Sequence, residues 1–255
     1  MTLIWRPGYM PLDDPDAADY IAAVEAADEA ASPGIGALET GVRYAINDFV
    51  IGCKQDGIWS AIKACCILAG ARTLSGALVP LKGTAPTNYN FVAGDYNRKT
   101  GLVGDGSTKW LNSNRSHLSD PLNSVHLSVF QTTVFNVGVV LIGNAVTPRC
   151  AIYTSGWAIR TSGVVASPAT NVTGFLGASR SASANYLVRA ASSTRSIQAV
   201  SETLSADDNY GVYARSSGGN SNARLAFYSI GESLDLALLD TRVSNLMTAI
   251  GAAIP

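Results

Sequence analysis

The sequence predicts a mainly β protein: an antiparallel jelly-roll sandwich with N-terminal helices and a C-terminal amphipathic helix. Short runs of alternating apolar and polar residues recur through residues 76–231, and clusters of Gly, Ser, Asn and Pro separate them at roughly 8–12 residues, a spacing typical of sandwiches. Before and after this region, apolar residues recur at helical spacing instead. A chain of 255 residues can form one large β domain or two small domains.

Residues 1–37 are predicted to form an acidic arm followed by a helix. The helix begins where Asp14 can cap it and Pro15 suits the first helical position, and it ends at Ser32. The arm before it is apolar but interrupted by Pro and Gly, so it cannot form a core and is either mobile or docked on a partner. Its candidate assembly residues are Trp5, Tyr9 and Met10.

Residues 38–75 are expected to form a helical pair, because two stripes of apolar residues follow a period of three or four. The first stripe comprises Leu38, Val42, Ala45, Ile46 and Phe49. The second comprises Ile58, Ile62, Cys65 or Cys66, and Ala69, with Gly57 and Gly70 at its ends. The two stripes can pack on each other or on a sheet.

Residues 76–231 are expected to form the β jelly roll. The predicted strands are 77–81, 88–92, 99–103, 109–112, 124–135, 139–142, 150–154, 157–161, 175–180, 186–190, 196–200, 210–215 and 223–230. Residues 104–107, Gly-Asp-Gly-Ser, predict a hairpin turn between two of them. In the strand at 124–135, His126 and Ser128 are expected on a polar face, opposite Val125, Leu127 and Val129.

Residues 232–255 are predicted to form the closing helix, with Ser233 as its cap. Its apolar stripe must bury either against this protein's own sheet or against a partner. The residues of this stripe that are candidates for assembly contacts are Leu239, Val243 and Leu246.

The distribution of acidic residues argues against an enzyme. Residues 121–201 contain no Asp or Glu, and their only formal charges are arginines. A glycosidase needs two carboxylates that face each other across a groove, and no predicted strand carries alternating acids. A catalytic triad needs a positioned histidine, but His117 is expected in a polar loop and His126 on a polar strand face. We therefore expect no catalytic residues and no cofactor.

Charge and hydropathy also limit the possible partners. The formal net charge is −1, and the Lys and Arg residues do not cluster as they would in a nucleic-acid-binding protein. No apolar run has the length of a membrane span, so neither nucleic acid nor membrane is an expected partner. The four cysteines lack a Cys-x-x-Cys spacing, and buried free thiols are expected rather than a metal site or a disulfide. This cysteine pattern fits folding in a reducing cytoplasm.

Two blocks of the sequence carry a resemblance to a known family. One includes the Ile-Trp pair at 58–59 and the segment Gly-Leu-Val-Gly-Asp-Gly-Ser-Thr-Lys at 101–109, and the other is Leu-Ala-Phe-Tyr-Ser-Ile-Gly at 225–231, just before the final helix. Together they resemble the concanavalin A-like, or LamG-like, jelly-roll proteins of tailed bacteriophages, over about residues 40–250. The match does not cover the acidic segment 1–37, the candidate for virion attachment.

This resemblance implies a non-enzymatic structural protein of the phage virion, in a tail fibre or baseplate, that presents its jelly roll for assembly and host attachment. Its partners would be other virion proteins and possible host surface glycans. A homo-oligomer is expected, a trimer by analogy with fibres. The protein would be made in the host bacterial cytoplasm and would reside in the virion. Two alternatives are a carbohydrate-binding receptor-recognition lectin and a head decoration or cement protein.

Two sets of residues are candidates for ligand binding. LamG-like jelly rolls often bind calcium at a rim, which makes Asp95, Asn97 and Asp105 weak calcium candidates, although turn formation also explains these residues. A sugar-binding surface needs exposed aromatic rings beside polar side chains, and the alternative is that the rings fill the core. The aromatic candidates are Trp110, Tyr153, Trp157 and Tyr186.

Overall fold

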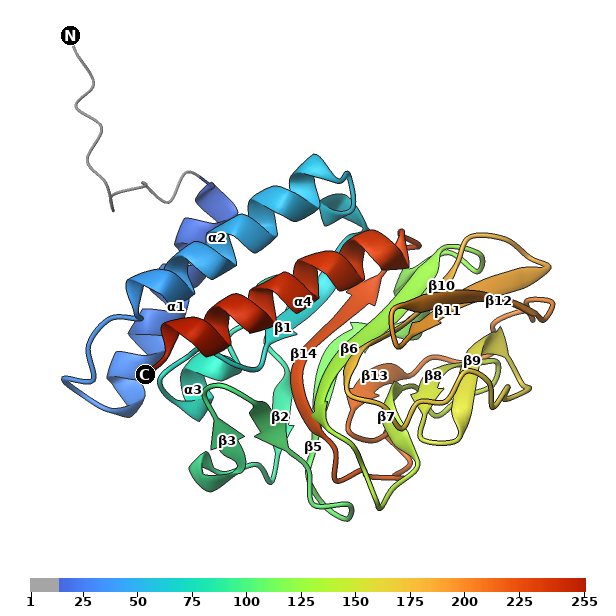
Figure 1. Ribbon diagram of the computed structural model, residues 1–255. Helices are drawn as coiled ribbons and strands as arrows, with labels where there is room; N and C mark the ends of the chain where they lie inside the picture. Colours follow the sequence, from blue (N-terminus) through green and yellow to red (C-terminus); the bar gives the residue numbers. More distant parts are fainter. Residues whose placement is uncertain (1–13) are drawn as a thin grey trace, which may run out of the picture.

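Two antiparallel sheets stack face to face, and three long helices lie on one side of the stack (Figure 1). The computed structural model describes residues 14–255. The predicted mainly β sandwich with N-terminal helices and a C-terminal helix is confirmed. The candidate assembly residues Trp5, Tyr9 and Met10 lie outside the described residues.

The first sheet has 8 strands, in the order β12 (Ser193–Gln198), β11 (Asn185–Ala190), β10 (Gly174–Arg180), β6 (Val125–Thr133), β14 (Arg224–Gly231), β4 (Gly101–Val103) and β3 (Tyr96–Asn97), and β1 (Ile62–Ile67) also pairs with β14. The second sheet has 6 strands, in the order β2 (Thr87–Tyr89), β5 (Trp110–Ser116), β13 (Asn209–Val212), β7 (Val140–Gly143), β8 (Arg149–Tyr153) and β9 (Gly156–Thr161). The α-helices are α1 (Pro15–Ala31), α2 (Thr40–Gln55), α3 (Leu74–Ala77) and α4 (Leu236–Ala253). Short 3-10 turns are η1 (Trp59–Ala61), η2 (Ala93–Asp95) and η3 (His117–Ser119).

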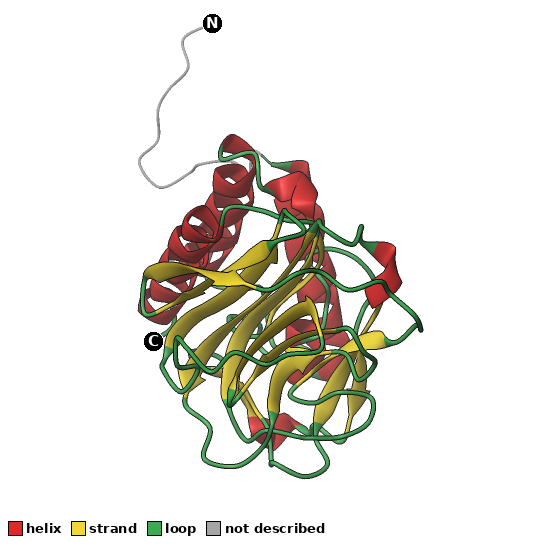
Figure 2. Ribbon diagram, turned by 90° about the vertical axis from the view of Figure 1, so that its right-hand side faces the viewer, coloured by secondary structure: helices red, strands yellow, loops and turns green. Residues whose placement is uncertain are grey.

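The apolar residues form two main cores, one on each side of the first sheet. Between the sheets, Val125, Leu127 and Val129 of β6 are fully buried, as their alternation predicted. On the other side of the first sheet, α1, α2 and α4 bury their apolar stripes, and Phe49 meets Phe227 edge to face at 5.7 Å. Figure 2 shows the helices gathered on one side of the strands, so within residues 14–255 the second sheet carries no long helix on its outer face.

The predicted second helix of the 38–75 pair is wrong, because residues 62–67 form β1. This strand pairs with β14 from Ile62 opposite Gly231 to Ile67 opposite Phe227. Cys65 faces the helical core and Cys66 faces the core between the sheets, so both faces of the strand are apolar. A strand buried on both faces gives a continuous apolar run, which periodicity cannot distinguish from a helix.

Two predictions in residues 76–112 need correction. The strand expected at 77–81 is absent there, because α3 ends at Ala77 and a turn follows. The hairpin expected around 104–107 is also wrong, since β4 belongs to the first sheet and β5 to the second. The Gly-Asp-Gly-Ser segment does turn the chain, but it carries it from one sheet to the other. Local turn chemistry does not specify which strand the next segment will pair with.

The closing helix buries against its own sheet rather than a partner. Leu239 and Val243 are 0% exposed and Leu246 is 2% exposed, all within the core under α4. These three residues are therefore not available for assembly contacts, which corrects that prediction. The cap is Asp235 instead of Ser233, because its carboxylate accepts hydrogen bonds from the amides of Ala237 and Leu238.

Both histidines are buried, contrary to the expected polar loop and polar face. His126 is fully buried because the helical layer covers its side of β6, and Nδ1 lies 2.6 Å from the carbonyl oxygen of Glu232. Nε2 lies 3.0 Å from the hydroxyl of Ser229. Burial lowers the pKa of His126 to about 4, so this imidazole is neutral near pH 7. His117 lies in η3 and is likewise buried, and burial lowers its pKa.

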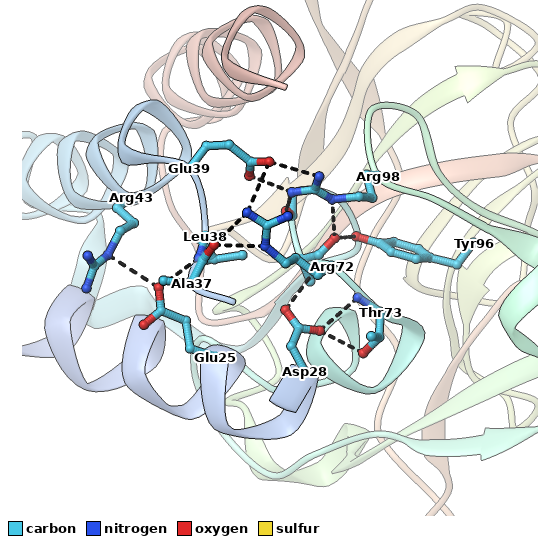
Figure 3. Close-up of polar contacts among 12 residues, drawn as sticks. Glu25, Asp28, Ala37, Leu38, Glu39, Arg43, Arg72, Thr73, Tyr96 and Arg98 are labelled. Carbon is cyan, nitrogen blue, oxygen red and sulfur yellow. Dashed lines mark hydrogen bonds and ion pairs between the residues drawn. The ribbon is translucent and has the colours of Figure 1, made fainter. Parts of the chain in front are cut away.

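A polar network joins the helical layer to the sandwich (Figure 3). The buried carboxylate of Asp28 on α1 accepts hydrogen bonds from the amides of Arg72 and Thr73, at 2.8 Å each, and from the Thr73 hydroxyl at 2.7 Å. Glu39, at the N-cap position of α2, pairs with Arg98 at 2.6 Å. Because α1 is part of this layer, an attachment role for segment 1–37 would belong to the residues before the helix.

The structure also shows the state of the cysteines and the lengths of the helices. Cys53, Cys65, Cys66 and Cys150 are all free and buried, as expected. Among residues 14–255, the helices are too short or too polar to span a bilayer.

Candidate functional site

Three of the four predicted sugar-binding aromatics belong to the interior. Trp157 is 0% exposed, Tyr186 is 1% exposed and Tyr153 is 4% exposed. The Trp157 indole donates to the carbonyl of Pro168 at 2.7 Å, and the Tyr186 hydroxyl donates to the carbonyl of Trp157 at 3.1 Å. For Trp157 and Tyr186, the alternative interpretation that these rings fill the core is correct. Tyr153 instead lies in a small buried cluster on the outer side of the second sheet.

Trp110 is only partly buried, and it stacks on a residue that the sequence analysis did not select. Trp110 of β5 is paired with Tyr89 of β2, and the two rings are nearly parallel, with centroids 4.4 Å apart and an interplanar angle of 5°. Tyr89 is 40% exposed. By strand alternation the pair lies on the outer face of the second sheet, near its β2 edge, and Trp110 also packs against the core between the sheets. We call these two residues the aromatic platform.

The local sequence explains the position of the platform. Along β5, Leu111 and Ser113 are buried while Trp110 and Asn112 alternate outward. Gly211 of β13 lies beside the Trp110 ring, and a Cβ atom there would stand 3.3 Å from that ring. The absence of a side chain at this position leaves room for the indole to lie against the sheet. The platform therefore depends on the pairing of β2 with β5 and on the close approach of the Trp110 indole to Gly211.

Polar side chains surround the platform. Thr87 lies opposite Asn112 in the β2–β5 register, on the same face as the two rings. The amide of Asn114 donates to the carbonyl of Ala85 at 2.8 Å and to the Thr87 hydroxyl at 3.0 Å. Asn90 donates to the carbonyl of Thr108 at 2.9 Å. An exposed ring flanked by amides and hydroxyls can stack on an apolar sugar face and hydrogen-bond its hydroxyls.

The weak calcium candidates are used in turns, which was the alternative interpretation. Asp105 Oδ1 accepts from the amides of Ser107, Thr108 and Lys109, while Asn97 Oδ1 accepts from the amides of Lys99 and Thr100. Asp95 pairs with the ammonium of Lys109 at 2.6 Å. Among residues 14–255, no cluster of three or more His, Cys, Asp or Glu side chains could hold a metal ion.

The pKa of Asp105 reflects this turn. Burial acts to raise the pKa of its carboxyl, but the hydrogen bonds from Thr108, Lys109 and Ser107 outweigh that effect and hold it well below its usual value. Asp105 is therefore ionised and committed to the local backbone.

Two arginines of the acid-free stretch are fully buried, and among residues 14–255 neither pairs with a carboxylate. Arg180 donates to five backbone carbonyls, those of Ile159, Ala182, Ser183, Asn185 and Ala199, at 2.9–3.2 Å. Arg160 donates to the carbonyls of His117 and Asp120. These guanidinium groups connect strands to loops at the end of the sandwich, so they have a structural role that composition did not indicate.

Comparisons with known proteins add little to this geometry. No protein-family model matches the sequence, and no curated protein matches it either. A solved structure, that of Domain 4 of AbnA, a GH43 extracellular arabinanase from Geobacillus stearothermophilus, in complex with arabinotriose, covers 62% of this chain and 82% of its own. The sequences are 14% identical and the TM-score is 0.34. A likeness at this level carries no argument about function.

Proposed function

We propose that this chain is a non-enzymatic binding protein that contacts surface glycans through the aromatic platform. The observation that supports this proposal is the stacked pair of Tyr89 and Trp110, with Tyr89 40% exposed. Trp110 is partly buried against the core between the sheets, but Tyr89 exposes a flat apolar face of the kind that stacks on sugar rings. The surrounding Asn and Thr side chains would orient the ligand through hydrogen bonds.

Binding without hydrolysis is part of this proposal. The acids near the platform are Asp95, which pairs with Lys109, and Asp105, which is held by its own turn. Hydrolysis requires one protonated and one ionised carboxyl across a groove. The strongest test is to incubate the protein with any glycan it binds and to measure new reducing ends. Formation of new reducing ends by the wild-type protein, and its loss in Asp95→Asn, would contradict the proposal.

The glycan-binding proposal can be tested on an array with the full chain presented on multivalent particles. We expect binding to at least one glycan class, with at least a roughly tenfold loss in Tyr89→Ala and in Trp110→Ala. Val200→Ala is the control, because Val200 is 70% exposed and lies on a loop after β12. Absence of binding to every glycan at high valency would refute the proposal.

We also propose a location for this activity: a tailed-phage virion, with the chain in a tail fibre or baseplate and virion proteins as its partners. The support for this is the sequence resemblance described above, not the comparisons. The arm before α1 would provide attachment, because α1 itself contributes Ala17, Ile21 and Val24 to the core. A trimer or other homo-oligomer would multiply weak glycan contacts, and light scattering on the purified chain tests the copy number.

Electron microscopy of particles that carry a tagged chain tests the location. We expect the tag on the tail, whereas a tag on the head would support the decoration or cement alternative. Deletion of residues 2–12 should leave the helical layer intact and reduce incorporation into particles. Normal incorporation of this truncated chain would refute attachment through the arm, and absence of the chain from particles would refute a virion role altogether.

A further inference from the structure

The outer face of the second sheet holds a second polar cluster, formed by Arg149, Tyr153 and Arg215. Arg149 and Tyr153 are four residues apart on β8, so both side chains point to the same face. The residue between them on that face is Ala151, whose small side chain lets the two longer ones approach over it. Arg215 follows β13, and its guanidinium carbon lies 5.9 Å from the centre of the Tyr153 ring.

The path of the chain explains how Arg215 reaches this cluster. Residues after β13 fold back over the sheet, since a Cβ atom on Gly211 would stand 2.5 Å from the carbonyl oxygen of Ala214. This fold places Arg215 against Tyr153 from the β13 side, while Arg149 approaches from the other end of β8. Beneath them, Ala151 and Ala158 are both 0% exposed, so the rim side chains cover a floor of small residues.

All three side chains have polar atoms without a partner. Nε of Arg149, Nε of Arg215 and the hydroxyl of Tyr153 are buried, and none makes a hydrogen bond of regular geometry, although Arg215 lies close enough to the Tyr153 hydroxyl to act on it as a donor. Among residues 14–255, neither of the two arginines forms an ion pair, although both are partly exposed. Burying a donor without a partner destabilises a fold, so a group that satisfied these donors would stabilise this arrangement. The acid-free stretch around β8 provides no such group.

The charge state of the cluster favours an anion. Burial raises the pKa of the Tyr153 hydroxyl, while Arg149 and Arg215 act in the opposite direction. The hydroxyl therefore stays protonated near pH 7 and can donate. Two guanidinium groups with a tyrosine hydroxyl between them present converging donors, and planar guanidinium groups bind carboxylates through paired hydrogen bonds.

We propose that Arg149, Tyr153 and Arg215 bind the carboxylate of an acidic saccharide. This inference rests on the proposed glycan-binding function and specifies its ligand class. The cluster and the aromatic platform lie on the same sheet, and β5 and β8 are three strand spacings apart, about 14 Å. One oligosaccharide can reach both, stacking a ring on Tyr89 and placing a uronate group at the arginines. The cluster has two cations, Arg149 and Arg215, and this small number fits a single carboxylate better than a polyphosphate chain.

The test compares oligogalacturonate with the neutral galactose oligomer of the same length, using the full chain and titration calorimetry near 0.15 M salt. We expect the acidic oligomer to bind at least about tenfold more tightly. Arg149→Gln and Arg215→Gln should each remove that preference, and Tyr153→Phe should weaken it several-fold while keeping the ring. Arg195→Gln is the matched control, since Arg195 is exposed on β12 of the first sheet. Circular dichroism confirms that each variant folds.

A second measurement separates this inference from the proposed function. Galacturonate monomer is titrated while the arginine Nε–H resonances are followed by NMR, and we expect shifts at Arg149 and Arg215 in both wild type and Tyr89→Ala. Those shifts without any oligomer binding would support the carboxylate site and refute the platform. Equal affinity for acidic and neutral oligomers, with both arginine variants unchanged, would overturn the carboxylate site and leave the platform standing. Equal competition by inorganic sulfate would also overturn it, because it would show a site for any small anion.

Discussion

The two outer faces of the sandwich use the same kinds of residue differently. On the first sheet, helices cover the face, and cations pair with carboxylates, as in Arg242 with Asp56 and Arg189 with Asp240, both at 2.7 Å. The outer face of the second sheet lacks such helices, and within the part of the chain that the structure describes Arg149 and Arg215 pair with no carboxylate. Under the proposed carboxylate site, the helical side serves stability, and the unsatisfied groups of Arg149, Tyr153 and Arg215 on the other side serve a ligand.

Aromatic residues show the same contrast. Phe227 meets Phe49 inside the helical core, where both rings are buried. Tyr89 meets Trp110 at the edge of the second sheet, where Tyr89 is 40% exposed. Removing a ring on the helical side should therefore cost folding free energy, whereas removing one on the other side should cost binding.

Arg180→Met should have the largest effect on stability, because Arg180 is fully buried and, among residues 14–255, pairs with no carboxylate. Its loss removes donors from five carbonyls, and we expect the free energy of unfolding to fall by about 4 kcal/mol in a urea titration. Arg195→Gln, at an exposed position, should change it by less than about 0.5 kcal/mol. Equal small losses would show that the carbonyl contacts of Arg180 do not stabilise the sandwich.

Leu239→Ala tests the burial of the α4 stripe. Leu239 is 0% exposed, and we expect its truncation to lower the free energy of unfolding by about 3 kcal/mol through lost burial and a cavity. Leu238→Ala is the neighbouring control, since Leu238 is 37% exposed and should cost well under 1 kcal/mol. A stable Leu239→Ala that fails only in particle assembly would restore the assembly role that the structure contradicts.

His126 predicts a pH dependence of stability on the helical side. The pKa of His126 is about 4 in the folded protein, below its ordinary value near 6.5, so the unfolded chain binds a proton first as pH falls. Stability is therefore fully present above pH 6.5 and is lost as pH falls toward 4. We expect a loss of about 2 kcal/mol between pH 7 and pH 5, measured by urea titration.

His126→Gln is the control for this pH effect, because glutamine does not titrate. The variant should be less stable at pH 7, yet its stability should change less between pH 7 and pH 5. His117 remains in the variant, and its pKa is also lowered by burial, so part of the slope should persist. An unchanged slope would mean that His126 is protonated without cost inside the fold.

Tyr89→Ala should have the smallest effect on folding. Because Tyr89 is 40% exposed, we expect the free energy of unfolding to change by less than about 1 kcal/mol, while glycan binding falls at least about tenfold. Parallel urea titration and array binding on one preparation test both halves. A loss of several kcal/mol would place the aromatic pair among the structural residues and would remove the contrast between the two faces.

Prediction from sequence succeeded where the pattern was local. Alternation correctly placed β6, with Val125, Leu127 and Val129 facing the core, and the spacing of Leu239 and Val243 correctly indicated a helix. It failed at β1, since a strand buried on both faces has no alternation to detect. Sequence patterns also did not identify Tyr89 as part of the candidate site, because its ring meets Trp110 only through the pairing of β2 with β5.

The sequence by itself determined the fold class, the helices on either side of the β region and the acid-free composition of residues 121–201. It also predicted the buried free thiols. Periodicity, composition and residue chemistry are local properties, so one sequence is enough to reveal them. Only the tertiary structure decided which rings were exposed and which arginines lacked partners. Pairing and stacking bring together residues distant along the chain, such as Arg149 with Arg215, and no local pattern records that neighbourhood. The candidate site depends on these long-range contacts, while the layers that carry it depend on patterns within single segments.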